Sequence, residues 1–102
     1  MKKPTKRTQD SKYLLRLYVS DSTAKSKIAV ANIKNVCEEH LNGRYKLEVI
    51  DIDKHVQLAR DEQIIAIPTL IKRLPLPLQR LVGDMSDLNK VLFGLDLKVR
   101  TS

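Results

Sequence analysis

The segment from Tyr13 to Val19 constrains the fold more than any other part of the chain. Arg16 is its single charged residue, and aliphatic and aromatic side chains make up the rest. A short apolar run of this kind indicates a strand that is buried on both faces, as in the sheets of α/β proteins. The sequence that follows is therefore expected to supply a covering helix and a second strand.

The residues up to Ile52 complete a β-α-β unit. The polar turn at 20–23 offers several helix N-cap residues, and Asn42-Gly43 is a typical helix end. Between them, apolar residues recur at helical spacing, at Val30, Ile33, Cys37 and Leu41. Apolar and charged residues then alternate from Tyr45 to Val49, which indicates a second strand. The crossover should be right-handed and the two strands parallel.

The second half of the chain allows more than one interpretation. Residues 54–62 have a helical composition, whereas Ile64–Ile67 are strand-like, and Leu81-Val82-Gly83 fits a brief strand. Pro75 and Pro77 interrupt any regular element, because proline lacks the backbone N–H. The last segment follows helical spacing up to Leu95 but a period of two from there to Val99. Gly94 lies at this junction and leaves both continuations open.

Length and charge predict one domain with a basic tail. The 102 residues are typical of a single core, which we assign to 12–102. Residues 1–16 hold six basic residues and one acidic residue, although the whole chain carries only +7. We expect residues 1–11 to be a flexible basic extension. A nucleic-acid-binding role for this tail is an alternative, but one phenylalanine and three tyrosines do not suggest a base-stacking platform.

Cofactor and metal sites are not expected. Cys37 is the only cysteine, which excludes an internal disulfide and a cysteine-based zinc site, and fits a cytosolic protein. No apolar run is long enough for a signal peptide or a membrane span, so we expect a cytoplasmic location. His55 with Asp51 and Asp53 is better interpreted as a solvated turn than as a metal site, and Asp84 and Asp87 as helix N-terminal acids.

Ile67-Pro68-Thr69 is similar to the cis-proline loop that faces the active site of thioredoxin-like proteins. In those proteins the redox cysteines follow the first strand, but the segment from Ser20 to Ser26 holds no cysteine. Without a thiolate, disulfide exchange has no nucleophile. Cys37 lies on the apolar face of the predicted helix, and pairing it with His40 would supply neither an oxyanion site nor a cleft. We therefore expect no catalytic residue and no enzyme activity.

The order of several short motifs resembles the KaiB family of circadian clock proteins. The motifs are Arg16–Val19, Val49–Asp53, Gln57–Ala59, Ala66–Leu70, Leu74-Pro75, Gly83-Asp84 and Lys90–Leu97. The resemblance implies a non-enzymatic regulator that binds the ring ATPase KaiC, with KaiA as a further partner left open. It also implies an α/β fold with two forms. The resting form is a β-α-β-β-α-α-β homotetramer, expected in a crystal, and the alternative is a thioredoxin-like β-α-β-α-β-β-α monomer.

The same resemblance suggests which residues matter. Tyr13, Gly94 and Asp96 match family positions where substitution biases the switch between the two forms. Pro68, Pro75 and Pro77 are further candidates, because X-Pro bonds isomerise slowly. Positions linked to partner contact are occupied by Lys46, Glu48, Gln63, Lys72, Leu76, Pro77 and Arg80.

Several of these positions depart from the family pattern. Glu48, Gln63 and Gln79 stand where basic residues are common. The sequence therefore leaves two further hypotheses open beside a KaiC-binding clock regulator. One is a KaiB-like protein that acts in stress adaptation through another partner, and the other is the nucleic-acid binder with a basic tail.

Overall fold

The computed structural model describes residues 12–97, and they form four strands and three helices. The elements are β1 (Tyr13–Val19), α1 (Ala24–His40), β2 (Tyr45–Asp51), α2 (Val56–Asp61), β3 (Thr69–Leu74), β4 (Gln79–Val82) and α3 (Leu88–Gly94). This β-α-β-α-β-β-α order is the thioredoxin-like one of the two orders expected, not the resting order. The basic extension at 1–11 and the segment Lys98-Val99 lie outside the described residues.

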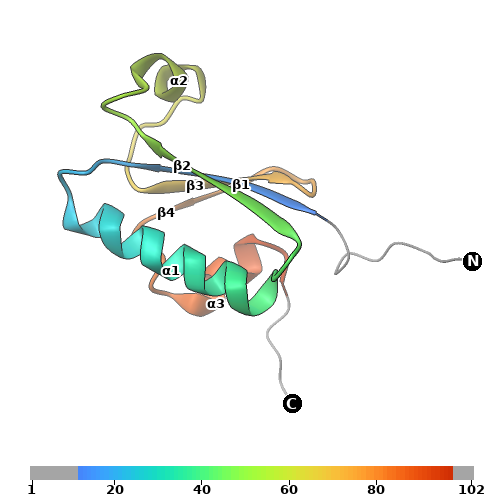
Figure 1. Cartoon of the computed structure of the whole chain (residues 1–102). Helices are drawn as coiled ribbons and strands as arrows, with labels where there is room; N and C mark the ends of the chain where they lie inside the picture. The colour runs from blue at the N-terminus through green and yellow to red at the C-terminus, as the bar shows by residue number, and fades with distance from the viewer. Residues whose placement is uncertain (1–11, 98–102) are drawn as a thin grey trace, which may run out of the picture.

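One sheet organises the molecule, with strand order β2-β1-β3-β4. β1 and β2 are parallel, as the β-α-β interpretation predicted, whereas β3 pairs antiparallel with β1, and β4 antiparallel with β3. α1 and α3 cover one face of the sheet, and α2 stands on the other side (Figure 1). We call the face on the α2 side the open face.

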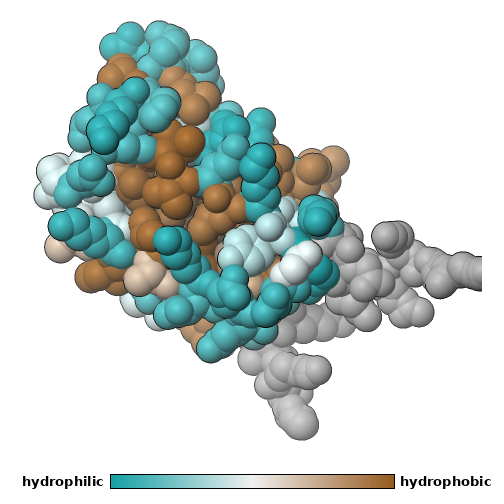
Figure 2. All heavy atoms as spheres, in the orientation of Figure 1, coloured by the Kyte–Doolittle hydropathy of each residue, from teal (hydrophilic) through white to brown (hydrophobic). Residues whose placement is uncertain are grey.

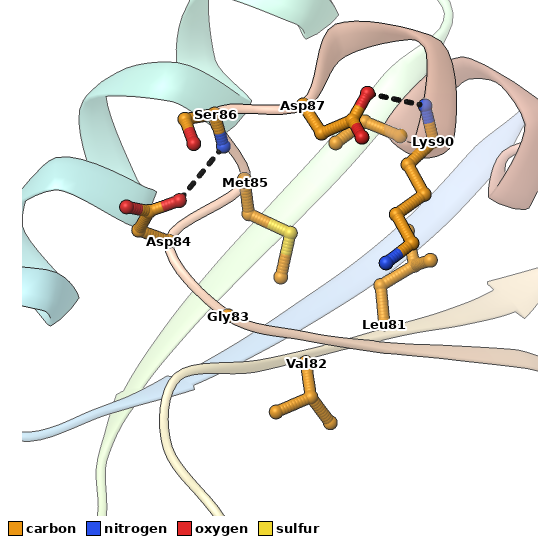
Figure 3. A pocket seen from close by; sticks show the side chains of 9 residues that line it. Leu81, Val82, Gly83, Asp84, Met85, Ser86, Asp87 and Lys90 are labelled. Carbon is orange, nitrogen blue, oxygen red and sulfur yellow. Dashed lines mark hydrogen bonds between the residues drawn. The ribbon is translucent and has the colours of Figure 1, made fainter.

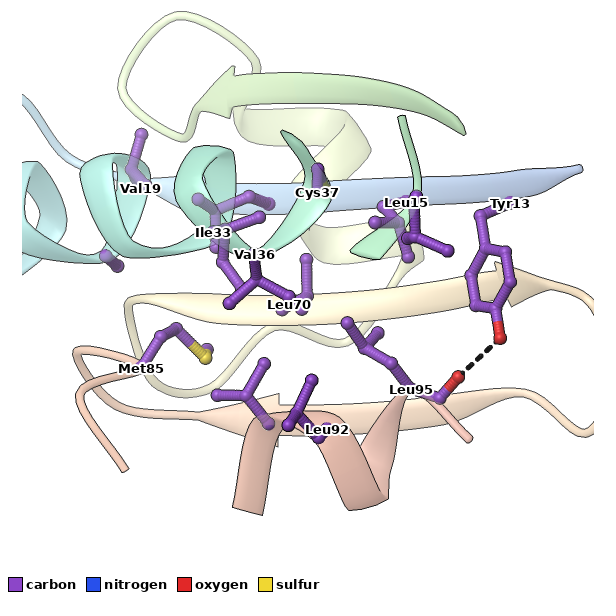
Figure 4. Close-up of a cluster of buried hydrophobic side chains, with 14 residues drawn as sticks. Tyr13, Leu15, Val19, Ile33, Val36, Cys37, Leu70, Met85, Leu92 and Leu95 are labelled. Atoms are coloured by element: carbon purple, nitrogen blue, oxygen red, sulfur yellow. Dashed lines mark hydrogen bonds between the residues drawn. The ribbon is translucent and has the colours of Figure 1, made fainter. Parts of the chain in front are cut away.

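The first half folds as its sequence dictates. Thr23 caps α1 by accepting a hydrogen bond from the Ser26 N–H at 3.2 Å. The core lies between the sheet and the two helices α1 and α3 (Figure 4). Its fully buried members include Leu15 and Leu17 of β1 and Ile33 of α1. Burial of this apolar surface is the main favourable contribution to folding.

The second half consists of shorter elements. The predicted helix at 54–62 is confirmed as α2, but none of its residues is buried and its N-terminus has no side-chain cap. The prediction that Ile64–Ile67 belong to a strand is wrong, because pairing begins only at Thr69, after Pro68, and Ile65 is 97% exposed. Pro75 and Pro77 lie in the turn between β3 and β4, where their missing N–H groups interrupt no ladder.

The ambiguity of the last segment is resolved in favour of a helix. α3 ends at Gly94, and the Asp87 carboxylate caps it by accepting from the Lys90 N–H at 3.2 Å. This confirms the interpretation of Asp87 as a helix N-terminal acid. No helix within residues 12–97 has both the length and the apolar character needed to cross a membrane.

Candidate protein-binding surface

Two apolar projections flank the open face, at opposite ends of β3. One is the loop of residues 62–67 between α2 and β3, where Ile65 is almost entirely exposed. The other is the hairpin tip of residues 75–78, where Leu76 is 73% and Leu78 51% exposed. Figure 2 shows the hairpin tip as an apolar projection on the right, and a further apolar area between α2 and α1. Exposed apolar area rimmed by polar residues is typical of a protein-interaction surface.

Charged side chains occupy the open face between these projections. Arg16 of β1 donates to Glu48 of β2 at 3.0 Å, and Arg73 of β3 donates to Glu62 at 2.8 Å. Glu62 also lies 3.8 Å from Arg16, while Arg80 of β4 donates to the backbone carbonyl of Glu62. We call these five residues the Glu62 cluster. It links all four strands to the end of α2.

The predicted partner-contact residues separate into three groups. Lys46, Gln63, Leu76 and Pro77 are exposed and available to a partner. Glu48 and Arg80 are accessible but engaged in the Glu62 cluster. Lys72 is 1% exposed and faces the opposite side of the sheet, so direct partner contact by Lys72 does not fit this arrangement. The physical reason is strand alternation, because Lys72 shares the core-facing side of β3 with Leu70.

Two of the three predicted switch residues, Tyr13 and Asp96, make contacts near the end of α3. The Tyr13 hydroxyl donates to the Leu95 carbonyl at 2.8 Å, and the Lys72 ammonium lies 3.2 Å from the Asp96 carboxylate (Figure 4 shows the tyrosine contact). Burial, with the nearby Asp96 carboxylate as a second cause, raises the pKa of Tyr13, so its hydroxyl stays protonated as a donor.

Gly94, the third of them, is tightly packed. A Cβ built on Gly94 would come within 2.6 Å of the Leu81 side chain. The three proline candidates all follow cis peptide bonds, with Pro68 directly before β3 and Pro75 and Pro77 in the hairpin tip. The switch candidates therefore lie near the end of α3 and at the two ends of β3.

The region after β1 is a hydroxyl network instead of a redox site. The Ser26 hydroxyl accepts from the Ser20 N–H at 3.0 Å and from the Thr23 hydroxyl at 2.7 Å. The Ser20 hydroxyl in turn donates to Asp53 at 3.1 Å. Cys37 is fully buried, and burial raises the pKa of its thiol to about 12, so the thiol is not a nucleophile at neutral pH. This agrees with its interpretation as a core residue.

Asp51 and Asp53 form the turn that the sequence predicted, because the Asp51 carboxylate accepts from the Asp53 N–H at 2.9 Å. Among residues 12–97, no three histidine, cysteine, aspartate or glutamate side chains gather where they could hold a metal ion. The Asp51 carboxylate has a local role in its own turn, while the Asp53 carboxylate accepts from Ser20 after β1.

Sequence reasoning missed one cavity of about 160 Å³ at the start of α3. Leu81, Gly83, Met85 and Lys90 are among its lining residues (Figure 3). Hydrogen bonds from Ser86 lower the pKa of Asp84 at its rim. The cavity is smaller than typical small-molecule sites, and no motif in the sequence signals it.

The fold and the cis-proline loop define a thioredoxin-like protein. The mitochondrial thioredoxin 3 of Saccharomyces cerevisiae superposes with a TM-score of 0.69 at 12% identity, covering 86% of this chain and 80% of that one. The N-terminal domain of SasA from Synechococcus elongatus superposes with a TM-score of 0.68 at 24% identity, covering 98% of both chains. These similarities establish the fold alone.

The sequence comparisons then identify the family. The KaiB domain model matches residues 16–97. The circadian clock oscillator protein KaiB of Synechococcus elongatus is 51% identical over 85 residues, which are 83% of each chain. The circadian clock protein KaiB3 of a Synechocystis species is 47% identical over 87 residues, or 85% of each chain. The chain belongs to the KaiB family.

Proposed function

We propose that this protein is a non-enzymatic regulator that binds a KaiC-like ring ATPase through the open face of its thioredoxin-like form. The observation that carries the proposal is family membership over residues 16–97, at about half identity to a circadian clock oscillator protein. Binding takes place in the cytoplasm and serves circadian or stress-response signalling.

The open face supports a binding role because large apolar side chains beside it are left exposed to water. Ile65 and Leu76 project at the two ends of β3, and both are exposed by more than two-thirds. Large exposed aliphatic side chains are costly in water and become the central contacts when a partner covers them. Exposed Lys46 and Gln63 would then lie at the polar rim of the interface.

The proposal includes a second arrangement of the chain. KaiB-like proteins have a resting homotetramer with the order β-α-β-β-α-α-β, and only the thioredoxin-like monomer binds the ring. The weak anchoring of α2, which has no buried residue, supports such a rearrangement. Two packings within a few kcal/mol would allow the partner to draw out the form that it binds.

Native mass spectrometry with a KaiC-like ATPase and ATP, after hours of incubation, tests the proposal. We expect a complex that Ile65→Ser weakens at least about tenfold, because the change removes a contact worth at least about 1.4 kcal/mol. Ile28→Ser is the matched control, since Ile28 is 46% exposed on α1, away from the open face. Lasting absence of a complex would refute the KaiC-like partner and favour the hypothesis of another partner.

A further inference from the structure

Glu62 is the point at which the open face and the loop of residues 62–67 are joined. Its carboxylate binds Arg73 at 2.8 Å and lies 3.8 Å from Arg16. Its side chain is only 19% exposed, so these interactions are partly shielded from water. The arginine side chains come from two neighbouring strands, β1 and β3, and converge on one acidic group.

Arg80 extends this junction into the backbone of the loop. Its guanidinium donates to the carbonyl of Glu62 and, at 3.4 Å, to the carbonyl of Gln63. The loop has a left-handed turn at this point, because Gln63 has a φ of 57°. A residue other than glycine keeps such a conformation only where its surroundings hold it. Arginines from three strands therefore fix the start of the loop.

Apolar packing does not hold the middle of the loop. Ile65 is 97% exposed, and Gln63 and Ala66 are exposed as well. At the far end, the Thr69 hydroxyl donates to the Ala66 carbonyl at 2.6 Å. At its start the loop is held by the charged groups and by backbone hydrogen bonds from Gln63 and Ile64 to α2, at 2.9 and 3.0 Å. At its end it is held by the Thr69 hydroxyl, and Ile65 projects between these contacts.

We propose that Glu62 is a positioning residue, and that the Glu62 cluster is an ionic latch which sets the position of Ile65 for partner binding. The partner role of Ile65 rests on the proposed function, whereas the latch itself belongs to the thioredoxin-like form and needs no partner. Because charge-assisted hydrogen bonds make the latch, salt weakens it. The ionic strength of the solution thereby regulates how well the binding surface is preformed.

The latch predicts a local effect that general stabilisation would not produce. If Glu62 only contributed to overall stability, removing its charge would speed exchange in every element and lower the unfolding temperature. If it positions the loop, the loop loosens while β1 and α1 keep their protection, because local openings need not involve the core.

Amide hydrogen exchange on the thioredoxin-like monomer of the full chain, isolated by size-exclusion chromatography and kept without any partner, distinguishes these cases. In Glu62→Gln we expect residues 63–67 to exchange about tenfold faster, with β1 and the unfolding temperature unchanged. Asp61→Asn is the matched control, because Asp61 is an exposed neighbouring acid whose carboxylate accepts from Gln57 at 2.9 Å, within α2 and outside the cluster. Raising the salt from about 0.05 M to about 0.5 M should loosen the loop of the wild type but not that of Glu62→Gln.

A charge swap provides the rescue. Glu62→Arg combined with Arg73→Glu restores one ion pair, and we expect loop exchange to return to within about threefold of the wild type. Unchanged loop exchange in Glu62→Gln would overturn the proposal, as would a uniform increase across all elements. Failure of the ATPase to bind would refute the proposed function and leave the exchange result standing, so the two outcomes are distinguishable.

Discussion

The two halves of this chain are held together in different ways. The half up to Asp51 has a 17-residue capped helix packed on a strand whose Leu15 and Leu17 are inaccessible to water. The half after it has helices of six and seven residues, and α2 buries none of its side chains. β3 and α3 do contribute buried residues, among them Leu70 and Leu92. Area buried from water determines most of the stability of an element, so α1 should resist change where α2 yields.

Specific polar contacts add to apolar burial in the second half, where β3 and α3 contribute Leu70 and Leu92 to the core. The Tyr13 hydroxyl holds the Leu95 carbonyl, Lys72 holds Asp96, and the Glu62 cluster holds the start of the loop. Polar contacts depend on geometry and can be exchanged for others at little net cost, since water competes for the same groups. A segment held in this way is suited to rearrangement.

The largest contrast is expected from apolar truncations in the two halves. Ile33→Ala in α1 removes a fully buried side chain and should lower the free energy of unfolding by about 2–5 kcal/mol. Ile65→Ala removes a side chain that is already exposed to water, and should change the free energy of unfolding by less than about 0.5 kcal/mol. Denaturant unfolding of both variants measures the difference, and similar losses would contradict the division into halves.

The buried thiol of the first half predicts a loss of stability in alkaline solution. The unfolded chain ionises Cys37 near its ordinary pKa of 9.0, whereas the folded chain keeps the thiol neutral up to about 12. The contribution of the thiol to the free energy of unfolding is therefore complete below pH 9. It declines as the pH rises towards 12, by up to about 1.4 kcal/mol per pH unit. Cys37→Ala should remove this part of the slope, which denaturation series at several pH values would show.

In the second half, the two partners of the Lys72–Asp96 pair should respond unequally. The side chain of Lys72 is 1% exposed, and that of Asp96 is 49% exposed. Asp96→Asn leaves a buried ammonium without its counter-charge and should cost about 1–3 kcal/mol. Lys72→Met releases a carboxylate to water and should cost less than about 1 kcal/mol. Equal losses from the two variants, in the same denaturant assay, would contradict this account of the pair.

The half of the chain up to Asp51 could be predicted from the sequence, whereas parts of the second half could not. The β-α-β unit is predictable, because the spacing of apolar residues is helical at Val30–Leu41 and alternates as in a strand at Tyr45–Val49. The composition of Ile64–Ile67 predicts a strand, but the segment forms a loop. β-branched residues favour strands only where a neighbouring strand pairs with them. Local composition does not reveal that neighbour.

The site was predicted less completely than the fold. Lys46 and Leu76 are exposed, and their contact with a partner stays a prediction. The Glu62 cluster depends on side chains separated by up to 64 residues, from Arg16 to Arg80. No spacing rule brings such residues together before the sheet order is known. Lys72 is a partner-contact candidate on the family resemblance, but the strand register places it on the core side of β3, where it is buried.

A small effect on stability is also expected at Gly94. A methyl group there meets the Leu81 side chain at 2.6 Å, but Leu81 also lines the cavity of about 160 Å³ and has room to move into it. Alanine also favours the helix by up to about 1 kcal/mol, so Gly94→Ala should change the free energy of unfolding by less than about 1 kcal/mol.

The family resemblance predicts a different effect of the same residue, on the equilibrium between two forms. Gly94→Ala together with Asp96→Arg is expected to shift an oligomer towards the thioredoxin-like monomer, even though the introduced guanidinium would face the buried Lys72 ammonium. Size-exclusion chromatography and NMR spectra measure this shift. If the double variant becomes monomeric although Asp96→Arg destabilises this form, the resting form must lose still more. If the double variant unfolds or stays unchanged, the contacts at the end of α3 determine its behaviour. The second half then has no alternative folded arrangement close in free energy.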